Sequence, residues 1–493
     1  MKHYDTTRYL CAAAQLDRAF RTQVLEQIID EEHRVINIPA GVDLLSVAKH
    51  CLDAKRRKLI RNVVISIFFV QACTEASQNF SVVKDTFSDS DSALFMSILS
   101  IYISFYFILA WVAVGFETWA TRHQIFSHLL KRNFNPDCVF LRTKTDNKLC
   151  SQLSGILNEE ECNVVVYSGF SPFVGSGVDI GGWSFAINTS QGKKGVGIAE
   201  EPEPFTIQEL YRHIDSDINK LNLQGTSIQD KIFVNGQQIR EDQRFLPDPL
   251  KRPLTRISLS DLTEIIGNQS ALTRHYKCIR IIDWQGEIIF SVFLRFVQLR
   301  QNLFIEASYF LLTPLKQEYR KIDEIQPNPT WQQRLQLIQN DFIKALFLFP
   351  GAIILLSQEL FIPLSRWNKR RAKRRSIREN PIFDYGAVTS VRELASSNLY
   401  SHYFQKLDTE MFIKIIEKQI LDTLIDFLDE HNIDTSDLRS RQDTILNNGV
   451  IVSGGSITAD NLTVGDRAKS VMNKMAQGVS SITGGEQTSR SKN

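Results

Sequence analysis

The residues best suited to chemistry lie in a glycine-rich loop, SGFSPFVGSGVDIGGW, which follows the short apolar run NVVVY. Backbone N–H groups without side chains beside them can approach an anion closely, as in phosphate-binding loops. The loop is not G-x-G-x-x-G, it lacks the GK[ST] of a P-loop, and it leads into the strand-like SFAINT, whereas a phosphate loop leads into a helix. Two interpretations stay open: a structural glycine turn, or a ligand-binding loop made by Gly175, Ser176, Gly177, Gly181 and Gly182.

The sequence contains no recognisable catalytic or metal-binding pattern. Ser171 lies in GFSPF, where Phe173 occupies the second glycine position of the nucleophile elbow G-x-S-x-G. The nine histidines are isolated, and no HExxH occurs. The seven cysteines are scattered without CxxC spacing, so they indicate a reducing compartment and no disulfide framework. We therefore assign no catalytic residue, no metal ligand and no cofactor, and leave open whether the protein is an enzyme.

A run of basic residues is the second chemically informative feature. Lys and Arg beside a membrane segment are attracted to anionic lipid head groups by roughly 1 kcal/mol each. Trp367 is the only aromatic residue in the run, which argues against a stacking surface for nucleic acid. We expect lipid head-group contact and no nucleic-acid binding from these residues: Arg366, Lys369, Arg370, Arg371, Lys373, Arg374, Arg375 and Arg378.

These groups must be positioned by a chain that enters a membrane. Ala93–Phe116 holds no formal charge and exceeds the about 20 apolar residues that a spanning helix needs. Residues 59–73 form a shorter, marginal first span, so residues 59–116 are predicted to be a transmembrane helical hairpin. Basic residues precede the first span and follow the second, which predicts a cytoplasmic location for both flanks.

A third apolar stretch lies in residues 331–364. Its uncharged part, Ala345–Ser357, is only about 13 residues long and is interrupted by Pro350-Gly351. A true span there would leave residues 135–325 outside the cell, because the basic run after it should be cytoplasmic. The length and the Pro-Gly pair favour a helix with an interfacial or re-entrant segment that does not cross.

The remaining chain has globular composition, and we expect most of it to bury a core. Residues 135–325 are predicted to be one cytoplasmic α+β domain. Its expected elements are strands at 138–142 and 163–167, a helix at Phe205–Leu221 capped by Thr206, a hairpin at Asn235-Gly236, and an antiparallel meander within residues 276–312. The middle strand of the meander is apolar on both faces, so it should be covered on both sides.

The predicted fold class is a membrane-anchored α+β protein with helical ends. The other predicted segments are a soluble helical N-terminus at 1–58, a connector at 117–134, the polybasic stretch at 365–378, a helical region at 385–447, a short β-coil tail at 448–477 and a disordered end at 478–493. An apolar stripe in the 385–447 region, which includes Met411, could pack within the chain or support a homo-oligomer through residues 405–470.

Several phrases resemble landmarks of an uncharacterised family of bacterial membrane proteins: TTRYLCAAAQLD, NVVVYSGFSPFVGSG, QRFLPDPLKRP, HYKCIRIIDW and LFIEASYFLL. The resemblance implies an anchor joined to soluble domains and brings no known activity. In addition, VIVSGGSITADNLTVGD is similar to the glycine-bounded tails that end many bacterial multidomain proteins and look like assembly elements.

These features lead to one main functional hypothesis and one rival. The main hypothesis is a multi-pass protein of the bacterial inner membrane whose cytoplasmic α+β domain acts as a ligand- or partner-binding sensor or scaffold. The rival is a membrane-associated enzyme that acts on a nucleotide or phospholipid through the glycine-rich loop at 169–183.

Overall fold

The computed structural model describes residues 5–86, 92–135, 153, 162–193, 200–267, 270, 272–326 and 329–447, and the side chains of 79–86, 92–99 and 359–367 fall outside that description. The chain forms two compact units. The helical unit consists of Met1–Glu32, Asp43–Leu157 and Gln317–Phe383, and the sheet unit consists of His33–Val42, Asn158–Lys316 and Asp384–Asn493. The predicted strand at 138–142 and the predicted tail segments at 448–477 and 478–493 lie outside the described residues.

The helical unit combines three long helices with several short helices and helical turns. Its elements are α1 (Asp5–Leu16), α2 (Arg18–Leu25), the π-helical turn η1 (Glu26–Asp30), α3 (Leu44–Thr86), α4 (Ser92–His128), α8 (Gln317–Arg320), the 3₁₀ turn η5 (Lys321–Glu324) and α9 (Trp331–Glu379). Helix α1 ends at Leu16, and the Asp17 side chain caps α2 by accepting from the Ala19 N–H at 2.7 Å.

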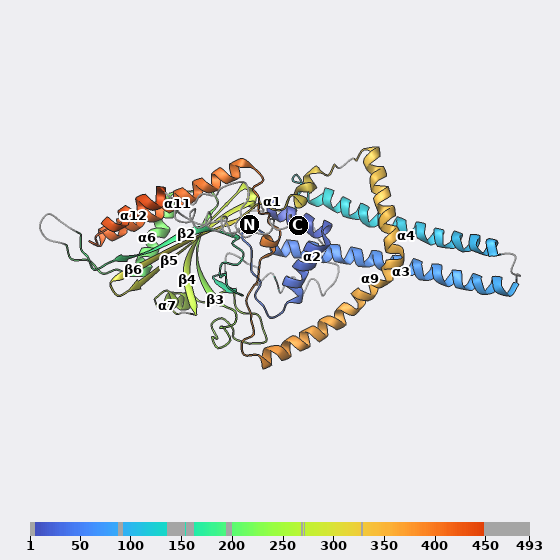
Figure 1. Ribbon diagram of the computed structural model, residues 1–493, viewed down its shortest axis with the longest axis horizontal. Helices are drawn as coiled ribbons and strands as arrows, with labels where there is room; N and C mark the ends of the chain where they lie inside the picture. Colours follow the sequence, from blue (N-terminus) through green and yellow to red (C-terminus); the bar gives the residue numbers. More distant parts are fainter. Residues whose placement is uncertain are drawn as a thin grey trace, which may run out of the picture. The chain divides into compact units, whose positions relative to one another are not determined.

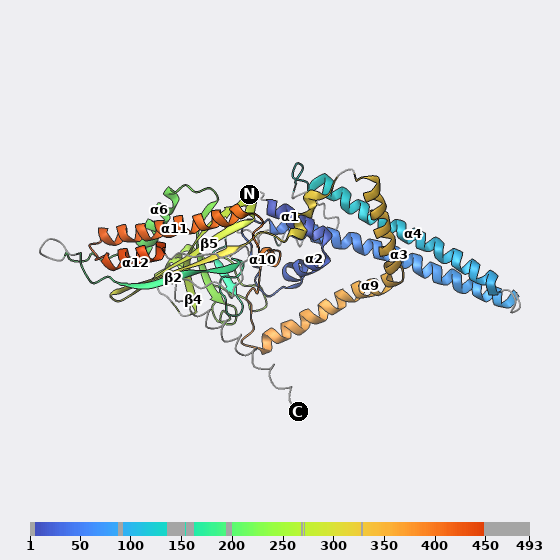
Figure 2. The ribbon, with the colours of Figure 1, turned by 45° about the horizontal axis from the view of Figure 1, so that its top comes forward.

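Helices α3 and α4 lie side by side, and α9 crosses them (Figures 1 and 2). The pair is antiparallel: Arg61 of α3 is 3.2 Å from Glu117 of α4, while Glu75 further along α3 accepts from Tyr106 further back on α4 at 2.6 Å. Their shared contact with α9 is apolar and aromatic, and it includes Ile65, Ala72, Tyr106, Ala110, Val114, Ala345, Phe349 and Ala352.

Within the described residues, three helical segments are long and apolar enough to cross a membrane, namely Leu44–Gln78, Ser100–His128 and Trp331–Gln358. The first contains the span expected at 59–73, and the second covers residues 100–116 of the span expected at 93–116. The third continues without a break through Pro350 and Gly351, so the Pro-Gly pair does not end the helix as its composition suggests.

The sheet unit contains a mixed six-stranded sheet in the order β1-β3-β4-β5-β6-β2. Its strands are β1 (Val164–Tyr167), β2 (Val178–Asn188), β3 (Thr226–Asn235), β4 (Thr273–Asp283), β5 (Ile288–Leu299) and β6 (Asn302–Leu312). Its helices are α6 (Ile207–Lys220), α7 (Leu259–Gly267), η4 (Trp284–Gly286), α10 (Val391–Leu394), α11 (Tyr403–Glu430) and α12 (Ser436–Asn447). Only the β1–β3 pair is parallel, and the predicted meander is β4-β5-β6.

Both faces of the sheet are covered (Figures 1 and 2). On one face α6 and α11 pack against β2, β4, β5 and β6 in a large apolar core. On the other face Phe173 of the glycine-rich loop lies in an aromatic cluster with residues of β3, β4, β5 and β6. As predicted, β5 is buried on both sides, with Phe290 in the first core and Phe293 in the aromatic cluster.

Two local predictions for this unit had different outcomes. Helix α6 has the predicted cap, a capping box between Thr206 and Glu209. The predicted hairpin at Asn235-Gly236 is wrong, because β3 pairs with β1 and β4 and no strand follows directly after Gly236. A side chain at Gly236 would meet the Gly386 nitrogen at 2.2 Å, so the glycine serves a close backbone approach instead of a two-residue turn.

Candidate functional site

The glycine-rich loop binds an anion, and that anion belongs to the chain itself. Gly175 and Gly177 have φ of +84° and +90°, values that favour glycine. Their N–H groups point the same way and donate to the Glu393 carboxylate, at 3.2 Å from Gly175 and 3.1 Å from Gly177. The predicted capacity of the loop for anions is thus used internally, and the prediction that it binds a separate ligand remains a prediction.

Two of the predicted loop glycines are also required by the neighbouring strand. A Cβ at Gly177 would meet the Leu311 carbonyl oxygen at 2.2 Å, and a Cβ at Gly182 would meet the Ala307 oxygen at the same distance. Both oxygens belong to β6, the partner of β2. Gly181 lies at the register shift of the β2–β6 pair, where its N–H donates to Asp179 at 2.8 Å.

Helix α10 delivers Glu393 to the loop and is itself fixed to the sheet by the preceding residue. Arg392 is fully buried and donates to the carbonyl oxygens of Glu287 at 3.0 Å and Thr313 at 2.7 Å. Ser390 and Glu393 form a capping box that starts the helix. The contact between Glu393 and the glycine-rich loop was not predicted from the sequence, although S-x-x-E at 390–393 is a recognisable helix-start signal.

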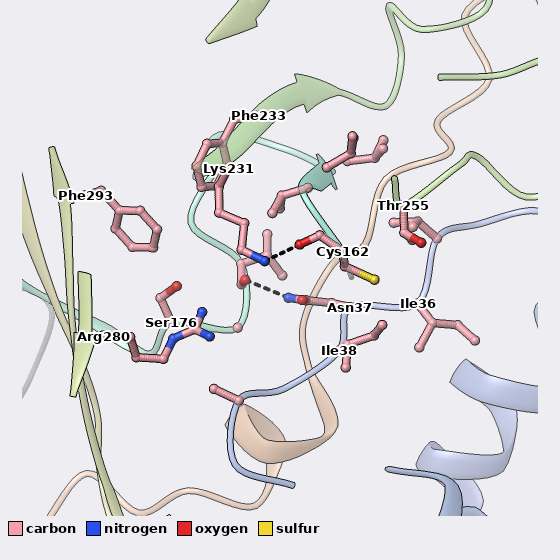
Figure 3. Close-up of a pocket in the computed structure, with 17 residues that line it drawn as sticks. Ile36, Asn37, Ile38, Cys162, Ser176, Lys231, Phe233, Thr255, Arg280 and Phe293 are labelled. Carbon is pink, nitrogen blue, oxygen red and sulfur yellow. Dashed lines mark hydrogen bonds between the residues drawn. The ribbon is translucent and has the colours of Figure 1, made fainter. Parts of the chain in front are cut away.

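Beside the loop lies a cavity whose polar lining is basic, here called the basic cavity (Figure 3). Lys231 of β3 and Arg280 of β4 reach it from the sheet, Ser176 comes from the glycine-rich loop, and Asn37 comes from the segment His33–Val42. The Asn37 amide donates to the Val174 carbonyl oxygen at 2.6 Å, which holds that segment against the loop. Of the predicted loop residues, Gly175 and Ser176 line this cavity.

Lys231 is the most buried cation of the cavity. Only 7% of it is exposed, and its Nζ donates to the Cys162 carbonyl oxygen at the start of β1. The side chains of Lys231 and Phe233 share a face of β3 because they are two residues apart. The sequence KIFV could therefore have indicated that Lys231 lies on the same face of its strand as the apolar Phe233.

The opposite face of the sheet carries a second buried polar cluster. Asp230 lies 2.8 Å from His275 Nε2 and 2.9 Å from Lys277 Nζ, and Lys277 also lies 2.8 Å from Asp215 of α6. Burial raises the pKa of Asp230, but the hydrogen bond from His275 and the charge of Lys277 outweigh it and hold that pKa at about 2. The ion pair between Lys277 and Asp215 links α6 to the sheet. Among the residues that the structure describes, no His, Cys, Asp and Glu cluster suits a metal ion.

The basic run lies on the last turns of α9 and part of it is paired. Arg370 is 3.0 Å from Glu32, and Lys373 also pairs with Glu31. Arg375 bridges to Glu379 along the helix at 2.7 Å. Exposed residues of the run are Lys369, Arg371, Arg374, Arg375 and Arg378, and the side chain of Arg366 lies outside the description. Lipid contact through this run remains a prediction.

A family model described as the AbeC-like domain matches residues 182–459, which is more than half of the chain. The chain belongs to the AbeC-like domain family. The matched region begins within β2 and includes α9 with its basic end, α10 and α11, whereas α3, α4, Gly175 and Gly177 precede it. The AbeC-like domain therefore contains Lys231, Arg280 and Glu393 but only part of the glycine-rich loop. No curated protein and no solved structure matched the chain.

Proposed function

We propose that this protein is a membrane-anchored binding protein, in which the α3–α4 hairpin crosses the bilayer and the sheet unit binds a ligand or partner on the cytoplasmic side. The hairpin supplies the anchor because both of its helices contain segments of spanning length and composition. The sheet unit supplies the binding part because it contains the basic cavity and the glycine-rich loop that Glu393 holds.

The observation that carries this proposal is the make-up of the sheet unit. It combines chain from before α3, chain from between α4 and α9, and chain from after α9. These parts are bonded to one another: the Val35 N–H donates to the Tyr385 carbonyl oxygen at 2.9 Å, and Tyr167 at the end of β1 forms a parallel bridge with Ala387.

A folded unit of this kind has to lie on one side of a membrane, since loops and sheet edges are not tolerated in lipid hydrocarbon. The chain must then cross the membrane an even number of times between any two of the segments that form the sheet unit. Helices α3 and α4 together meet this condition. Helix α9 stands alone between the second and third parts, so a single crossing by α9 is incompatible with the sheet unit.

We therefore propose that α9 does not cross the membrane, although its first half has the hydropathy of a span. One face of α9 packs on the hairpin through Ala345 and Phe349. Ile343, Phe347 and Ile354 are exposed on another face, at 52%, 73% and 63%. An apolar helix face followed by a basic run is typical of a segment that lies in the interface with anionic lipids.

The cytoplasmic orientation rests on the distribution of basic residues around the hairpin. Lys55, Arg56, Arg57 and Lys58 precede the first apolar segment, and Arg122 follows the second. Together with the resemblance to bacterial membrane proteins, this supports a multi-pass protein of the inner membrane. We do not propose the enzyme hypothesis, because Glu393 occupies the glycine N–H groups on which that hypothesis depended.

We also propose self-association through the start of α11, a surface that only partly overlaps the predicted range 405–470. The inner face of α11 is used by the chain's own sheet, through residues such as Ile416 and Ile420. The outer face of its first turns exposes Tyr403, Phe404 and Met411, at 70%, 65% and 45%. Changing these three residues to Ser should turn a detergent-solubilised oligomer into a monomer in size-exclusion chromatography with light scattering.

Labelling of single cysteines in intact cells tests the membrane arrangement. In a background in which all seven native cysteines are changed to Ser, a membrane-impermeant maleimide should label Ser77→Cys, toward the far end of the hairpin. It should not label Ser190→Cys or Ser401→Cys in the sheet unit, all three positions being exposed. Labelling of Ser401→Cys without Ser190→Cys would mean that α9 crosses. Labelling of both would refute the cytoplasmic orientation.

A further inference from the structure

The basic end of α9 is held by two acidic residues that follow η1. Glu32 lies 3.0 Å from Arg370 and 3.9 Å from Arg374. The preceding residue, Glu31, forms an ion pair with Lys373. All five residues belong to the helical unit, and their three ion pairs are here called the acidic contact. Part of the basic run is therefore already bound by carboxylates of the chain itself.

The acidic contact engages one side of α9. Positions 370, 373, 374 and 377 are spaced by three and four residues, so they lie on the same side of the helix. Ile377 is fully buried, which shows that this side faces protein. Lys369 and Arg378 lie at the two edges of this side and are exposed. The basic run thus offers its edges to head groups while the acidic contact holds its centre.

The acidic contact lies beside the two places where the chain passes between the helical unit and the sheet unit. Glu32 ends the first segment of the helical unit, and Phe383 ends the last one. The Lys373 ammonium lies 5.8 Å from the centre of the Phe383 ring, so this lysine contacts both segments. In the sheet unit the continuing chains are bonded to each other through Val35 and Tyr385. Opening the acidic contact would therefore detach the first segment from α9 at the point where it continues into the sheet unit.

The ion pairs of the acidic contact are weak enough to exchange partners. Their side chains are 21–58% exposed, and ion pairs open to water contribute little to stability. Anionic head groups attract Lys and Arg beside a membrane with a free energy of similar size for each cation. A bilayer rich in anionic lipid offers more negative charges than two carboxylates do. The partner of these cations should therefore depend on the charge of the lipid surface.

We propose that anionic lipid head groups open the acidic contact by replacing Glu31 and Glu32 as the partners of its three cations. The proposal rests on the function proposed above, in which the basic run meets the lipid interface, and it adds a regulatory step to that function. In zwitterionic lipid the first segment of the helical unit stays attached to α9. In anionic lipid that segment is released, so the connection into the sheet unit responds to the composition of the bilayer.

Hydrogen exchange of the full-length protein in nanodiscs tests the proposal. The Glu31 N–H donates to the Glu26 carbonyl oxygen at 3.0 Å, so protection of this amide reports whether the end of η1 is held. Replacing half of the phosphatidylcholine by phosphatidylglycerol should lower that protection about threefold or more in the wild type. In the double variant Glu31→Gln, Glu32→Gln, protection should already be low in phosphatidylcholine and should not change with phosphatidylglycerol.

Glu379→Gln is the matched control. Glu379 is exposed and pairs with Arg375 along α9 at 2.7 Å, outside the acidic contact. The variant removes one carboxylate from the same region, and it should respond to phosphatidylglycerol as the wild type does. The substituted glutamates are all partly or largely exposed, so each variant is expected to fold.

Three results would overturn the proposal. Unchanged protection of Glu31 in the wild type on addition of phosphatidylglycerol would show that the lipid does not open the acidic contact. The same loss of protection on adding soluble glycerol phosphate to phosphatidylcholine nanodiscs would show that any anion opens it. A wild-type response in the double variant Glu31→Gln, Glu32→Gln would show that the two carboxylates are not responsible.

The lipid that copurifies with the protein separates failure of this inference from failure of the function on which it rests. Phosphatidylglycerol should copurify with the wild type and should be lost in the double variant Lys369→Gln, Arg378→Gln. If this holds while Glu31 protection is independent of lipid, only the acidic contact is refuted. Equal retention by both proteins would also refute head-group contact by the basic run.

Discussion

Changing Glu417 to Gln should stabilise the sheet unit at pH 8 and have much less effect at pH 4.5. Glu417 lies on the inner face of α11 and is 2% exposed. One carboxylate oxygen accepts from the Tyr309 hydroxyl at 3.1 Å, and that hydroxyl accepts from the Trp183 indole at 2.5 Å. The other oxygen has no hydrogen-bond partner among the residues that the structure describes. The carboxylate is therefore poorly compensated for its burial.

Burial raises the pKa of Glu417 from 4.5 to about 6, against the hydrogen bond from Tyr309. A raised pKa means that the folded state binds the proton more tightly than the unfolded state. The resulting penalty on stability is absent below the unfolded pKa and complete above the folded one. A shift of about 1.5 units at about 1.36 kcal/mol each amounts to about 2 kcal/mol. The penalty should therefore develop as the pH rises from about 4.5 to about 6.

Thermal unfolding of the full-length protein at several pH values measures this effect. A gain of about 2 kcal/mol corresponds to a rise in Tm of about 4–8 °C for a unit of this size. The informative quantity is the Tm of Glu417→Gln minus that of the wild type, which should grow from pH 4.5 to pH 8. Glu430→Gln is the control, because Glu430 is exposed on the same helix. A Tm difference for Glu417→Gln that does not change with pH would refute the reasoning.

Three further predictions concern contacts inside single units. Gly177→Ala should destabilise the sheet unit by about 2 kcal/mol or more, seen as a lower Tm, because its methyl group would meet the Leu311 oxygen at 2.2 Å. Glu393→Gln should cost about 1–3 kcal/mol and speed hydrogen exchange at the Gly177 amide; unchanged exchange would show that the carboxylate does not hold the loop. Arg8→Met should cost about 3 kcal/mol in Tm-derived stability, because it removes a buried guanidinium that holds Asp323 at 2.6 and 3.0 Å. Asp323→Ala should cost no less, since it leaves the buried charge of Arg8 without that partner, and a neutral result for either would contradict the pairing.

The sequence predicted the parts of the fold whose signals are local. The meander β4-β5-β6 follows from alternating apolar residues joined by short turns, and the cap of α6 follows from Thr206 and Glu209. Pairings between distant segments carry no such signal. Strand β2 joins the far edge of the sheet beside β6, and β1 joins the other edge in parallel with β3. The apolar stripe of α11 left open whether it packs within the chain, and the structure buries Ile416 and Ile420 but leaves Met411 exposed.

The candidate site divides in the same way. The glycine-rich loop was found because its glycines are adjacent in sequence and their N–H groups form an anion-binding arrangement. Its partner Glu393 is 218 residues away from Gly175, and no local pattern links the two. Lys231 and Arg280 lie on two different strands, and the pairing of β3 with β4 brings them to one cavity. The anion-binding capacity of the loop could be predicted from the sequence. Its contact with Glu393 and the proximity of Lys231 to Arg280 depend on the fold and could not.

Hydropathy and packing lead to different expectations for α9. Trp331–Gln358 meets the criteria of length and composition for a span, as the hairpin helices do. Hydropathy scores one segment at a time and carries no information on where its two flanks must meet. Here both flanks of α9 contribute to one sheet unit, through residues up to Lys316 before it and from Asp384 after it. Separating them across a bilayer would expose the apolar core between α11 and the sheet, which costs far more than leaving one helix face at the membrane surface.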